Sequence, residues 1–328
     1  MVLLATSVRA KGGLLTISPV LLQVAQVLTV LAGAPLLQGF IIKMEERIQG
    51  CKGPSIFQPY RDIRKLLKKE LVVADTVSWV FWAAPVIAFT SMLIVPILIP
   101  VLTNYPLPLS NMGDILGGGL ILTLGSFAIL LAGLDSGQPF GGLGSSRAVM
   151  LTILAEPTLI LVFVGITFLD HSMLPFVANH VLVRSMSVYL SPAHLFLVLG
   201  FLILLTVETD RLPIHSSIHL EIYMIDEARI LEYSGPLLAV LKWATWMKQF
   251  ILYTIFLNVF FIPWGLSTTG SLGSIGLALL WIIVKYTGVA LVMVIIDTIQ
   301  SRLRFYRYQE PLALSFLFAI VALIANQL

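Results

Sequence analysis

The chain has 328 residues, of which 58% are hydrophobic and only 11% are charged. A soluble protein of this length needs far more charged surface, so this composition excludes an ordinary water-soluble enzyme and indicates a chain that is mainly surrounded by lipid. The single cysteine, Cys51, excludes an internal disulfide and cannot by itself ligate an iron–sulfur cluster, which usually needs four thiolates. We therefore predict one membrane domain over residues 1–328 that has no redox centre of its own.

Apolar runs long enough to cross a bilayer recur along the whole chain. A hydrocarbon core about 30 Å thick needs roughly 20 apolar residues per helix, and such runs lie at 14–42, 77–103, 113–134, 147–169, 192–210, 236–262, 273–299 and 310–327. The first run is too long for a signal-peptide core and is predicted as the first helix. Segment 171–190 is too polar for a crossing and is predicted as an interfacial or partly re-entrant helix. The predicted fold class is all-α, with about eight transmembrane helices plus amphipathic interfacial helices.

Lysine and arginine residues concentrate in alternate connections between these runs. One side of the predicted map carries 14 of them, the opposite side carries 3, and Lys242, Lys248 and Lys285 fall within helices. The positive-inside rule places the basic side in the cytoplasm. Both termini are therefore predicted on the non-cytoplasmic side.

The connection at 43–76 contains a predicted surface helix. Four apolar residues recur at helical spacing while four basic residues share the other face, namely Tyr60, Ile63, Leu67 and Leu71 against Arg61, Arg64, Lys65 and Lys68. This pattern predicts an amphipathic helix lying along the cytoplasmic surface. The residues alone leave two functions open, a basic strip on anionic lipid headgroups and a docking surface for a partner protein.

Glu156 lies near the middle of the predicted helix at 147–169. An ionisable group at this depth costs roughly 3 kcal/mol on insertion scales, so it normally faces a polar interior and marks an ion pathway. The next residue, Pro157, donates no backbone hydrogen bond and leaves the carbonyl of Ile153 available to water. We predict that Glu156 exchanges protons; the alternative is a protonated glutamate that bonds to a neighbouring helix.

A second group of ionisable residues lies around the end of the run at 192–210. Carboxylates and arginines alternate here, namely Glu208, Asp210, Arg211, Glu221, Asp226, Glu227, Arg229 and Glu232. They could form a hydrated acidic path or an ordinary solvated loop, and Glu208, just inside the membrane, is the stronger candidate for the path. Among the three membrane lysines, which could pair with these acids, Lys285 is the deepest and is the predicted relay residue.

No catalytic or nucleic-acid-binding pattern emerges from the sequence. His215 and His219 are four residues apart and could form a metal site with Glu221, but such pairs arise often by chance, so no metal site is predicted. The glycine clusters lack the spacing of nucleotide-binding loops. No catalytic residue is therefore assigned to this chain.

Several motifs together resemble a known family, the H subunit of respiratory complex I. Segment 47–70 resembles its first cytoplasmic loop, with Gly53-Pro54, Gln58-Pro59, Asp62 and Lys69-Glu70. Segments 131–137, 140–147 and 155–157, followed by 207–213 and 219–235, more closely resemble the membrane-anchor subunits of energy-converting nickel–iron hydrogenases and formate hydrogenlyases. The resemblance spans nearly the whole chain in the expected order.

The resemblance implies an anchor in a prokaryotic plasma membrane. Its expected partners are hydrogenase-like large and small subunits, an iron–sulfur subunit and antiporter-like membrane subunits, and the nickel–iron centre and iron–sulfur clusters would lie in those partners. Loops 43–76 and 211–235 would form the docking surface, with Arg47, Gln58, Pro59, Arg61, Asp62, Lys65, Arg211 and Glu232. The proton path would include Glu156, Glu208, Asp210, Glu221, Glu227 and Lys285.

Two departures from complex I bear on a quinone site. Ser55 stands where complex I commonly has asparagine, and Cys51 stands where a basic residue is expected. No quinone site is therefore assigned. A quinone-binding H subunit of a complex I-type dehydrogenase remains the first alternative, and a free-standing ion transporter that uses Glu156 and Lys285 is the second. Without an internal repeat, the sequence counts against the transporter.

Overall fold

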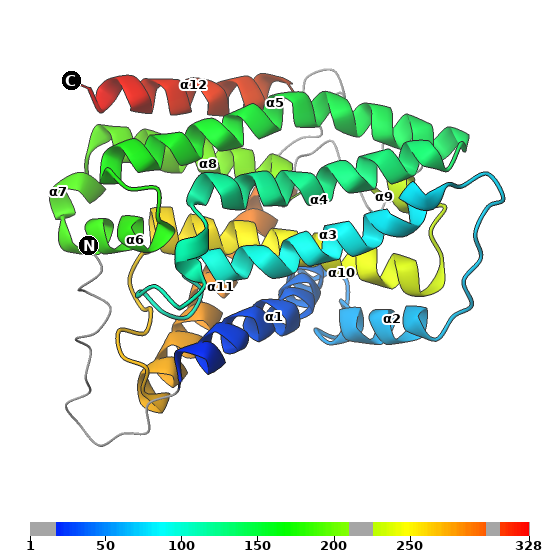
Figure 1. Ribbon diagram of the computed structural model, residues 1–328, viewed down its shortest axis with the longest axis horizontal. Helices are drawn as coiled ribbons and strands as arrows, with labels where there is room; N and C mark the ends of the chain where they lie inside the picture. Colours follow the sequence, from blue (N-terminus) through cyan, green and yellow to red (C-terminus); the bar gives the residue numbers. More distant parts are fainter. Residues whose placement is uncertain (1–17, 210–225, 300–308, 328) are drawn as a thin grey trace.

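The computed structural model describes residues 18–209, 226–299 and 309–327, and this part of the chain forms a bundle of helices without a named β-strand (Figure 1). Five helices are long and apolar enough to cross a membrane: α1 (Pro19–Ile48), α3 (Trp79–Leu98), α4 (Ile115–Asp135), α5 (Pro139–Asp170) and α11 (Leu272–Ile299). Two apolar helices, α8 (Pro192–Glu208) and α12 (Gln309–Ala325), have 17 residues each. At 1.5 Å per residue they reach about 25 Å, near the lower limit for a crossing.

The eighth rod is composite. Helix α10 (Gly235–Ile255) continues directly into a π-helix, η2 (Phe256–Phe261), and the two together run alongside the other rods (Figure 1). Short elements fill the connections, namely α2 (Gln58–Leu67), a 3-10 turn η1 (Ser110–Met112), α6 (Pro175–Arg184), α7 (Met186–Tyr189) and α9 (Asp226–Ile230). The prediction of an all-α, multi-pass membrane protein is confirmed.

Capping residues explain where several helices begin. Ser18, Ser78 and Ser191 each accept a backbone N–H of the first turn, and Asp114 accepts that of Gly117 at 2.7 Å. Side chains of this kind satisfy backbone donors that the first helical turn leaves unpaired. Pro19, Pro139 and Pro192 occupy the first helical position, where a proline costs no hydrogen bond.

Two predicted segments differ from the observed elements. Helix α5 begins at Pro139, eight residues before the predicted 147, because a proline suits the first helical position and the helix extends through a glycine-rich stretch beyond the apolar run. Segment 171–190 does not cross, as predicted, and forms α6 and α7 at one end of the bundle (Figure 1). Helix α6 has 10 residues, about half of what a crossing needs.

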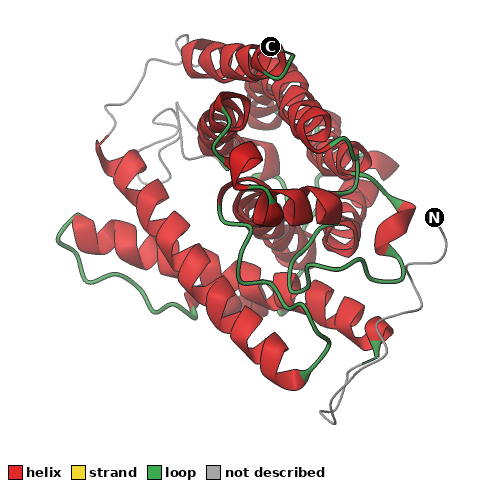
Figure 2. Ribbon diagram, turned by 90° about the vertical axis from the view of Figure 1, so that its left-hand side faces the viewer, coloured by secondary structure: helices red, strands yellow, loops and turns green. Residues whose placement is uncertain are grey.

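Helix α10 lies at the centre of the packing. It contacts α1, α2 and α3, while α5 packs against α4, α8 and α12, and α11 packs mainly on α1. Figure 2 shows most rods nearly end-on, with two helices crossing obliquely at the side of the bundle. Fully buried side chains such as Met247, Ile251 and Tyr253 fill the centre.

Most basic residues of the described chain lie at one end of the bundle. Helix α2 lies there, next to the C-terminal end of α1, whereas the start of α1 and the end of α12 lie at the opposite end (Figure 1). We call the end with α2 the basic end. The placement of both helix ends opposite to it agrees with the predicted alternation of crossings.

Candidate functional site

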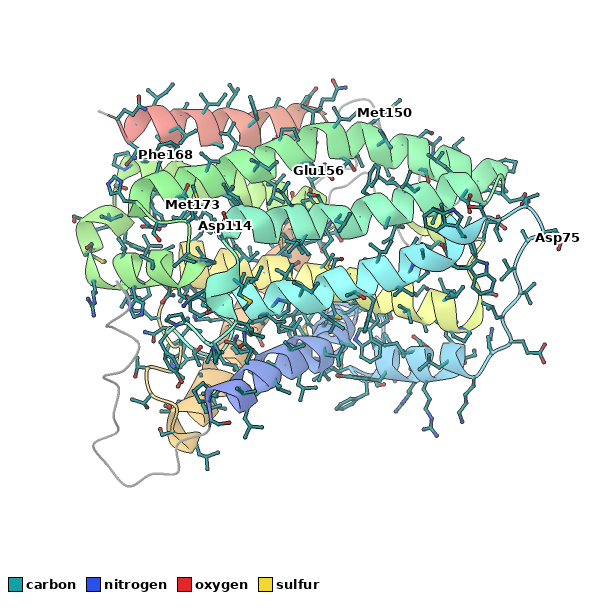
Figure 3. The ribbon with its side chains drawn as sticks, viewed as in Figure 1. Asp75, Asp114, Met150, Glu156, Phe168 and Met173 are labelled. Atoms are coloured by element: carbon teal, nitrogen blue, oxygen red, sulfur yellow. The ribbon has the colours of Figure 1, made fainter. Side chains whose placement is uncertain are left out.

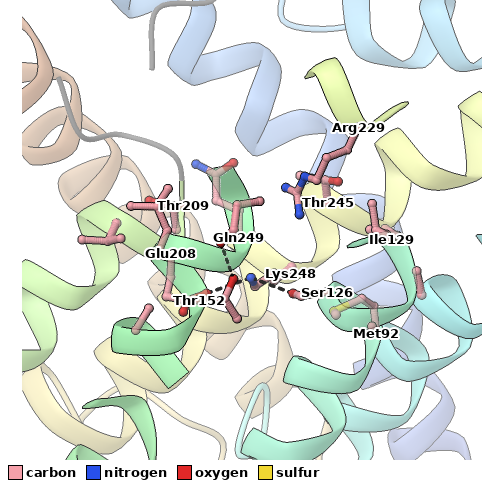
Figure 4. Close-up of a pocket in the computed structure, with 17 residues that line it drawn as sticks. Met92, Ser126, Ile129, Thr152, Glu208, Thr209, Arg229, Thr245, Lys248 and Gln249 are labelled. Atoms are coloured by element: carbon pink, nitrogen blue, oxygen red, sulfur yellow. Dashed lines mark hydrogen bonds and ion pairs between the residues drawn. The ribbon is translucent and has the colours of Figure 1, made fainter. Parts of the chain in front are cut away.

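An ion pair links the middle of α10 to the end of α8. Lys248 Nζ lies 2.8 Å from Glu208 Oε2 and 3.0 Å from Ser126 Oγ on α4 (Figure 4). The side chains are 21% and 11% exposed, so the pair is largely shielded. Two opposite charges that share a poorly solvated site stabilise each other, and removing one leaves the other uncompensated.

A cavity of about 100 Å³ opens beside this ion pair. Its polar lining comes from α4, α5, α8, α9 and α10 and includes Ser126, Thr152, Glu208, Thr209, Arg229, Thr245, Lys248 and Gln249 (Figure 4). A polar cavity larger than about 15 Å³ can hold a water molecule. This one therefore has room for several waters in contact with both members of the pair.

Glu156 lines a second, smaller cavity of about 20 Å³. The two cavities share Ser126, Thr152, Glu208 and Lys248, so they meet at the ion pair. Figure 3 shows Glu156 on α5 well inside the length of the bundle. Glu156 also interacts electrostatically with Glu208 and Lys248. The Lys248 ammonium thus bonds to one carboxylate, Glu208, and acts electrostatically on the second, Glu156. We call Glu156, Glu208 and Lys248 the acid–lysine site.

Lys285 does not line either of these cavities. Its ammonium donates to Asn258 Oδ1 at 3.0 Å and to the Ile262 carbonyl at 2.7 Å. Of the three membrane lysines, Lys248 is the one that pairs with an acid in the described structure. The polar residues Thr245 and Gln249, which share its helix face at helical spacing, were the available sequence signal.

Hydrogen bonds join three connections at the basic end. Ser234 Oγ accepts from the Val72 N–H and donates to the Val72 carbonyl, both at 2.7 Å. Tyr233 donates to the Phe81 carbonyl at 2.7 Å, and the two rings stack with their centroids 3.9 Å apart. Burial, together with the nearby Asp135 carboxylate, raises the pKa of Tyr233, so its hydroxyl remains protonated and able to donate.

Asp135 completes this linkage. Its carboxylate accepts from the Ser78 hydroxyl at 2.6 Å, from the Ser78 N–H at 2.8 Å and from the Phe81 N–H at 3.2 Å. The Thr76 hydroxyl donates to the Ser136 carbonyl at 2.8 Å. Segments 72–81, 135–136 and 233–234 therefore form one cross-bonded surface.

Helix α2 presents its charges away from the bundle. Pro59 and Ile63 are buried, whereas Arg61, Arg64, Lys65, Lys68 and Lys69 are exposed. Among the predicted docking residues, Gln58 Nε2 donates to Asp62 Oδ1 at 2.9 Å, Arg47 is exposed at the end of α1, and Glu232 is half-buried. The predicted apolar face is too long, because the helix ends at Leu67, and both Leu67 and Leu71 are exposed.

Other predicted residues lie outside the described part of the chain. These are Asp210, Arg211, Glu221, His215 and His219. Glu227 lies on α9, but its side chain is likewise not described. Within residues 18–209, 226–299 and 309–327, no group of three or more metal-ligating side chains is positioned to hold a metal ion.

Glycines of the 131–147 segment allow helices to approach closely next to Arg229, which lines the larger cavity. A Cβ atom on Gly141 would lie 2.5 Å from the Gly133 carbonyl oxygen, and one on Gly144 would lie 2.7 Å from the Ala228 Cβ. By contrast, a Cβ on Gly142 would meet nothing within 4 Å. Gly133, Gly141 and Gly144 therefore bring α4, α5 and α9 together around the larger cavity.

The chain is similar to subunits of two bacterial complexes over nearly its whole length. It is 32% identical to formate hydrogenlyase subunit 4 of Escherichia coli (strain K12) over 287 residues, which is 87% of this chain and 91% of that protein. It is 28% identical to hydrogenase-4 component C of the same organism over 303 residues, or 92% and 94% of the two chains.

A solved structure shares the fold. It is a chain of the membrane-bound sulfane sulfur reductase, an archaeal respiratory membrane complex, with a TM-score of 0.74 at 19% identity, covering 93% of this chain and 100% of that one. The fold, with its long apolar helices, defines an all-α multi-pass membrane protein. The NADH dehydrogenase family model matches residues 21–327, and the chain belongs to this family.

Proposed function

We propose that this chain is the membrane-anchor and proton-coupling subunit of a respiratory-type hydrogenase or formate hydrogenlyase complex. The main support for this proposal is the acid–lysine site. There the cavities lined by Glu156 and Glu208 meet at Lys248, inside a bundle of membrane helices. Two similar proteins are named formate hydrogenlyase subunit 4 and hydrogenase-4 component C, which supports the choice of complex. Electrons would move through iron–sulfur and nickel–iron centres held by partner subunits.

The coupling step follows from competition between two carboxylates for one ammonium group. With Glu208 ionised and paired to Lys248, a second negative charge at Glu156 would be repelled, so Glu156 holds a proton. When a proton reaches Glu208, the ammonium is free to stabilise an ionised Glu156, which releases its proton to the smaller cavity. One proton thereby moves from one cavity to the other while the net charge of the site is conserved.

The basic end supplies the surface on which partners would dock. The cross-bonded connections hold α9 and the loop before α3 in a fixed relation, and the larger cavity begins directly beneath α9 at Arg229. A charge change in a docked iron–sulfur subunit would therefore act on Glu208 and Lys248 at short range. In this proposal the basic end faces the cytoplasm and both termini lie on the other side.

The first experiment tests the partners. The chain is purified from its native membrane in mild detergent, and co-purifying proteins and metals are identified by mass spectrometry and metal analysis. Nickel, iron and hydrogenase-like large and small subunits are expected. Iron with flavin and quinone but no nickel would instead support a complex I-type dehydrogenase, and a stable, metal-free chain alone would support a free-standing transporter.

The second experiment tests the coupling role through Glu156→Gln. This change removes the exchangeable proton but keeps the size of the side chain, so assembly and hydrogenase activity with a soluble electron acceptor should be retained. Ion translocation into inverted vesicles should fall about tenfold or more, within the range typical of lost proton transfer. The matched control is Glu310→Gln, an exposed glutamate at the start of α12 that lines neither cavity. Normal translocation in Glu156→Gln would remove Glu156 from the mechanism.

A further inference from the structure

Helix α10 ends in a π-helical turn whose carbonyl groups accept hydrogen bonds from side chains of other helices. The π-helix η2 covers Phe256–Phe261, and the chain then leaves the helix at Ile262 and Pro263. Carbonyl groups at a helix end have no partner within the helix. Here they receive hydrogen bonds from α6, α7 and α11, and π-helical turns of this kind are frequently found at functional sites.

Two asparagines form the core of this arrangement. Asn179 on α6 donates to the carbonyls of Asn258 and Pro263, at 2.6 and 2.9 Å. Asn258 within η2 donates to the Pro100 carbonyl at 2.8 Å. Tyr189 on α7 donates to the Phe261 carbonyl at 2.8 Å. All of these bonds are made by uncharged groups.

Lys285 is the charged residue among the side chains that bond to the end of α10. Its side chain is only 4% exposed, and its two partners are the neutral oxygens Asn258 Oδ1 and Ile262 O. A buried ammonium is stabilised here by carbonyl groups at a helix C-terminal end rather than by a carboxylate. We call Lys285, Asn258, Asn179 and the Ile262 carbonyl the helix-end site.

Lys285 also connects two helices that otherwise meet through long side chains. Helix α11 packs mainly on α1, and its neighbouring Tyr286 reaches α10 by stacking on Phe250, with ring centroids 4.4 Å apart, and by a hydrogen bond with Thr254. The bonds from Lys285 to η2 continue this contact toward the end of α10. The charge on Lys285 therefore affects how firmly α11 is attached to α10.

A water-binding group lies in the same site. Asn179 Oδ1 is fully buried and has no hydrogen-bond partner within the described residues, while the amide nitrogen of Asn179 is committed to two carbonyls. An unpaired buried acceptor is costly, and an ordered water is the usual way to satisfy it. Such a water would give the Lys285 proton a path out of the site.

We propose that the helix-end site is a second proton-exchange site, in which the charged Lys285 holds α11 against η2 and the neutral amine releases it. The proton leaves Nζ for water and returns from water, and only the N–H bond breaks and reforms. Among the described residues, the titratable groups beside η2 are Tyr189, His194 and Tyr286, on α7, α8 and α11, and Asp297 lies further along α11. This inference rests on the proposed coupling function and assigns its outer step to Lys285.

The test compares charge-removing and charge-retaining variants in the intact purified complex. Lys285→Met removes the charge at similar length, Lys285→Arg keeps a charge that does not deprotonate, and Asn258→Asp offers Lys285 a carboxylate that keeps it charged. Hydrogen–deuterium exchange of peptides covering 256–263 and 280–290 measures the attachment of α11. Ion translocation measures function, and Lys242→Met is the control, a lysine on α10 outside the helix-end site.

In Lys285→Met, exchange in these peptides should rise about tenfold or more, because a charged hydrogen bond is lost, and translocation should fall. At least one of the two charge-retaining variants should keep wild-type protection and still lose translocation. A purely structural lysine would predict normal translocation in a protected Lys285→Arg or Asn258→Asp variant, and that result would overturn the proposal. Unchanged exchange in Lys285→Met would also overturn it, as would loss of protection in all three variants.

The experiments on Lys285 distinguish failure of the helix-end proposal from failure of the proposed coupling function. Hydrogen exchange reports on the helix-end site whether or not Glu156 takes part in translocation. If Glu156→Gln translocates normally while the Lys285 variants behave as described, the acid–lysine mechanism fails and the helix-end site stands. If Glu156→Gln fails to translocate and the protected Lys285→Arg variant translocates normally, only the further inference fails.

Discussion

Lys248 is the cation nearest to two half-buried acids, Glu156 and Glu208. Its ammonium bonds to Glu208 and Ser126, and both cavities touch it. A carboxylate left beside it without this charge would either carry an uncompensated charge or take up a proton. The position of Lys248, between Glu156 and Glu208, makes it the group that permits one acid to be ionised while the other is protonated.

We expect Lys248→Met to destabilise the protein by about 3 kcal/mol, the lower end for breaking a shielded pair, because cavity water can solvate part of Glu208. The double variant Lys248→Met/Glu208→Gln should recover part of this loss, since no unpaired charge then remains. Thermal unfolding of the purified complex gives the midpoints for both variants and for Lys242→Met as control. An additive double variant would mean that the ion pair makes no coupled contribution.

At the scale of elements, α4, α5 and α9 approach one another closely beside Arg229, which lines the larger cavity. Gly133, Gly141 and Gly144 permit this approach, because a methyl group at any of them would meet a neighbouring helix at under 3.0 Å. Small residues have this role in membrane bundles generally, since lipid and protein core are equally apolar and tight packing supplies the association energy. The glycine-rich motif is thus explained by packing rather than by a ligand.

Gly141→Ala should therefore destabilise the protein, by about 1–3 kcal/mol for an overpacked contact. Gly142→Ala is a matched control one residue away, where the added methyl meets nothing within 4 Å. We expect that control to be neutral or slightly stabilising, because alanine is the better helix former. Thermal unfolding midpoints in one detergent provide the comparison, and equal midpoints would contradict this explanation of the motif.

At the scale of the whole molecule, charge is distributed between two ends. Helix α2 and the two residues that follow it carry five exposed basic side chains at one end, and in the described part of the opposite end only Arg184 among the lysines and arginines is found. Basic segments are retained on the cytoplasmic side during insertion. This asymmetry supports the proposed orientation and provides a surface that suits an acidic partner or an anionic lipid face.

Cys51 permits a direct test of orientation, because it is the only cysteine of the chain and is exposed at the basic end. A membrane-impermeant maleimide should label Cys51 in inverted vesicles and leave it unlabelled in right-side-out vesicles. The variant Cys51→Ser/Ser187→Cys moves the thiol to the exposed Ser187 position on α7, at the opposite end, and should show the reverse pattern. Labelling of Cys51 from outside would reverse the orientation.

The sequence alone determined the fold class, the approximate crossings and the place of Glu156 within a long apolar helix, and it predicted the alternation of charge between the two ends. These features are local, because the length of an apolar run and the cost of a buried charge are read within one helix. The boundaries were less well determined. The starts of α1 and α5 differ from the apolar runs because a capped or proline-initiated helix need not begin where hydrophobicity begins.

The tertiary structure decided which polar groups meet. It placed Lys248 rather than Lys285 beside Glu208, and it placed Lys285 at the C-terminal end of α10. It also showed that Gly141 packs against a neighbouring helix whereas Gly142 does not. These helices are apolar on nearly all sides, and lipid accepts an apolar face as readily as a neighbouring helix does. The periodicity of a single sequence therefore does not specify how each helix is rotated, and only the packing of the bundle selects the partners of its few polar side chains.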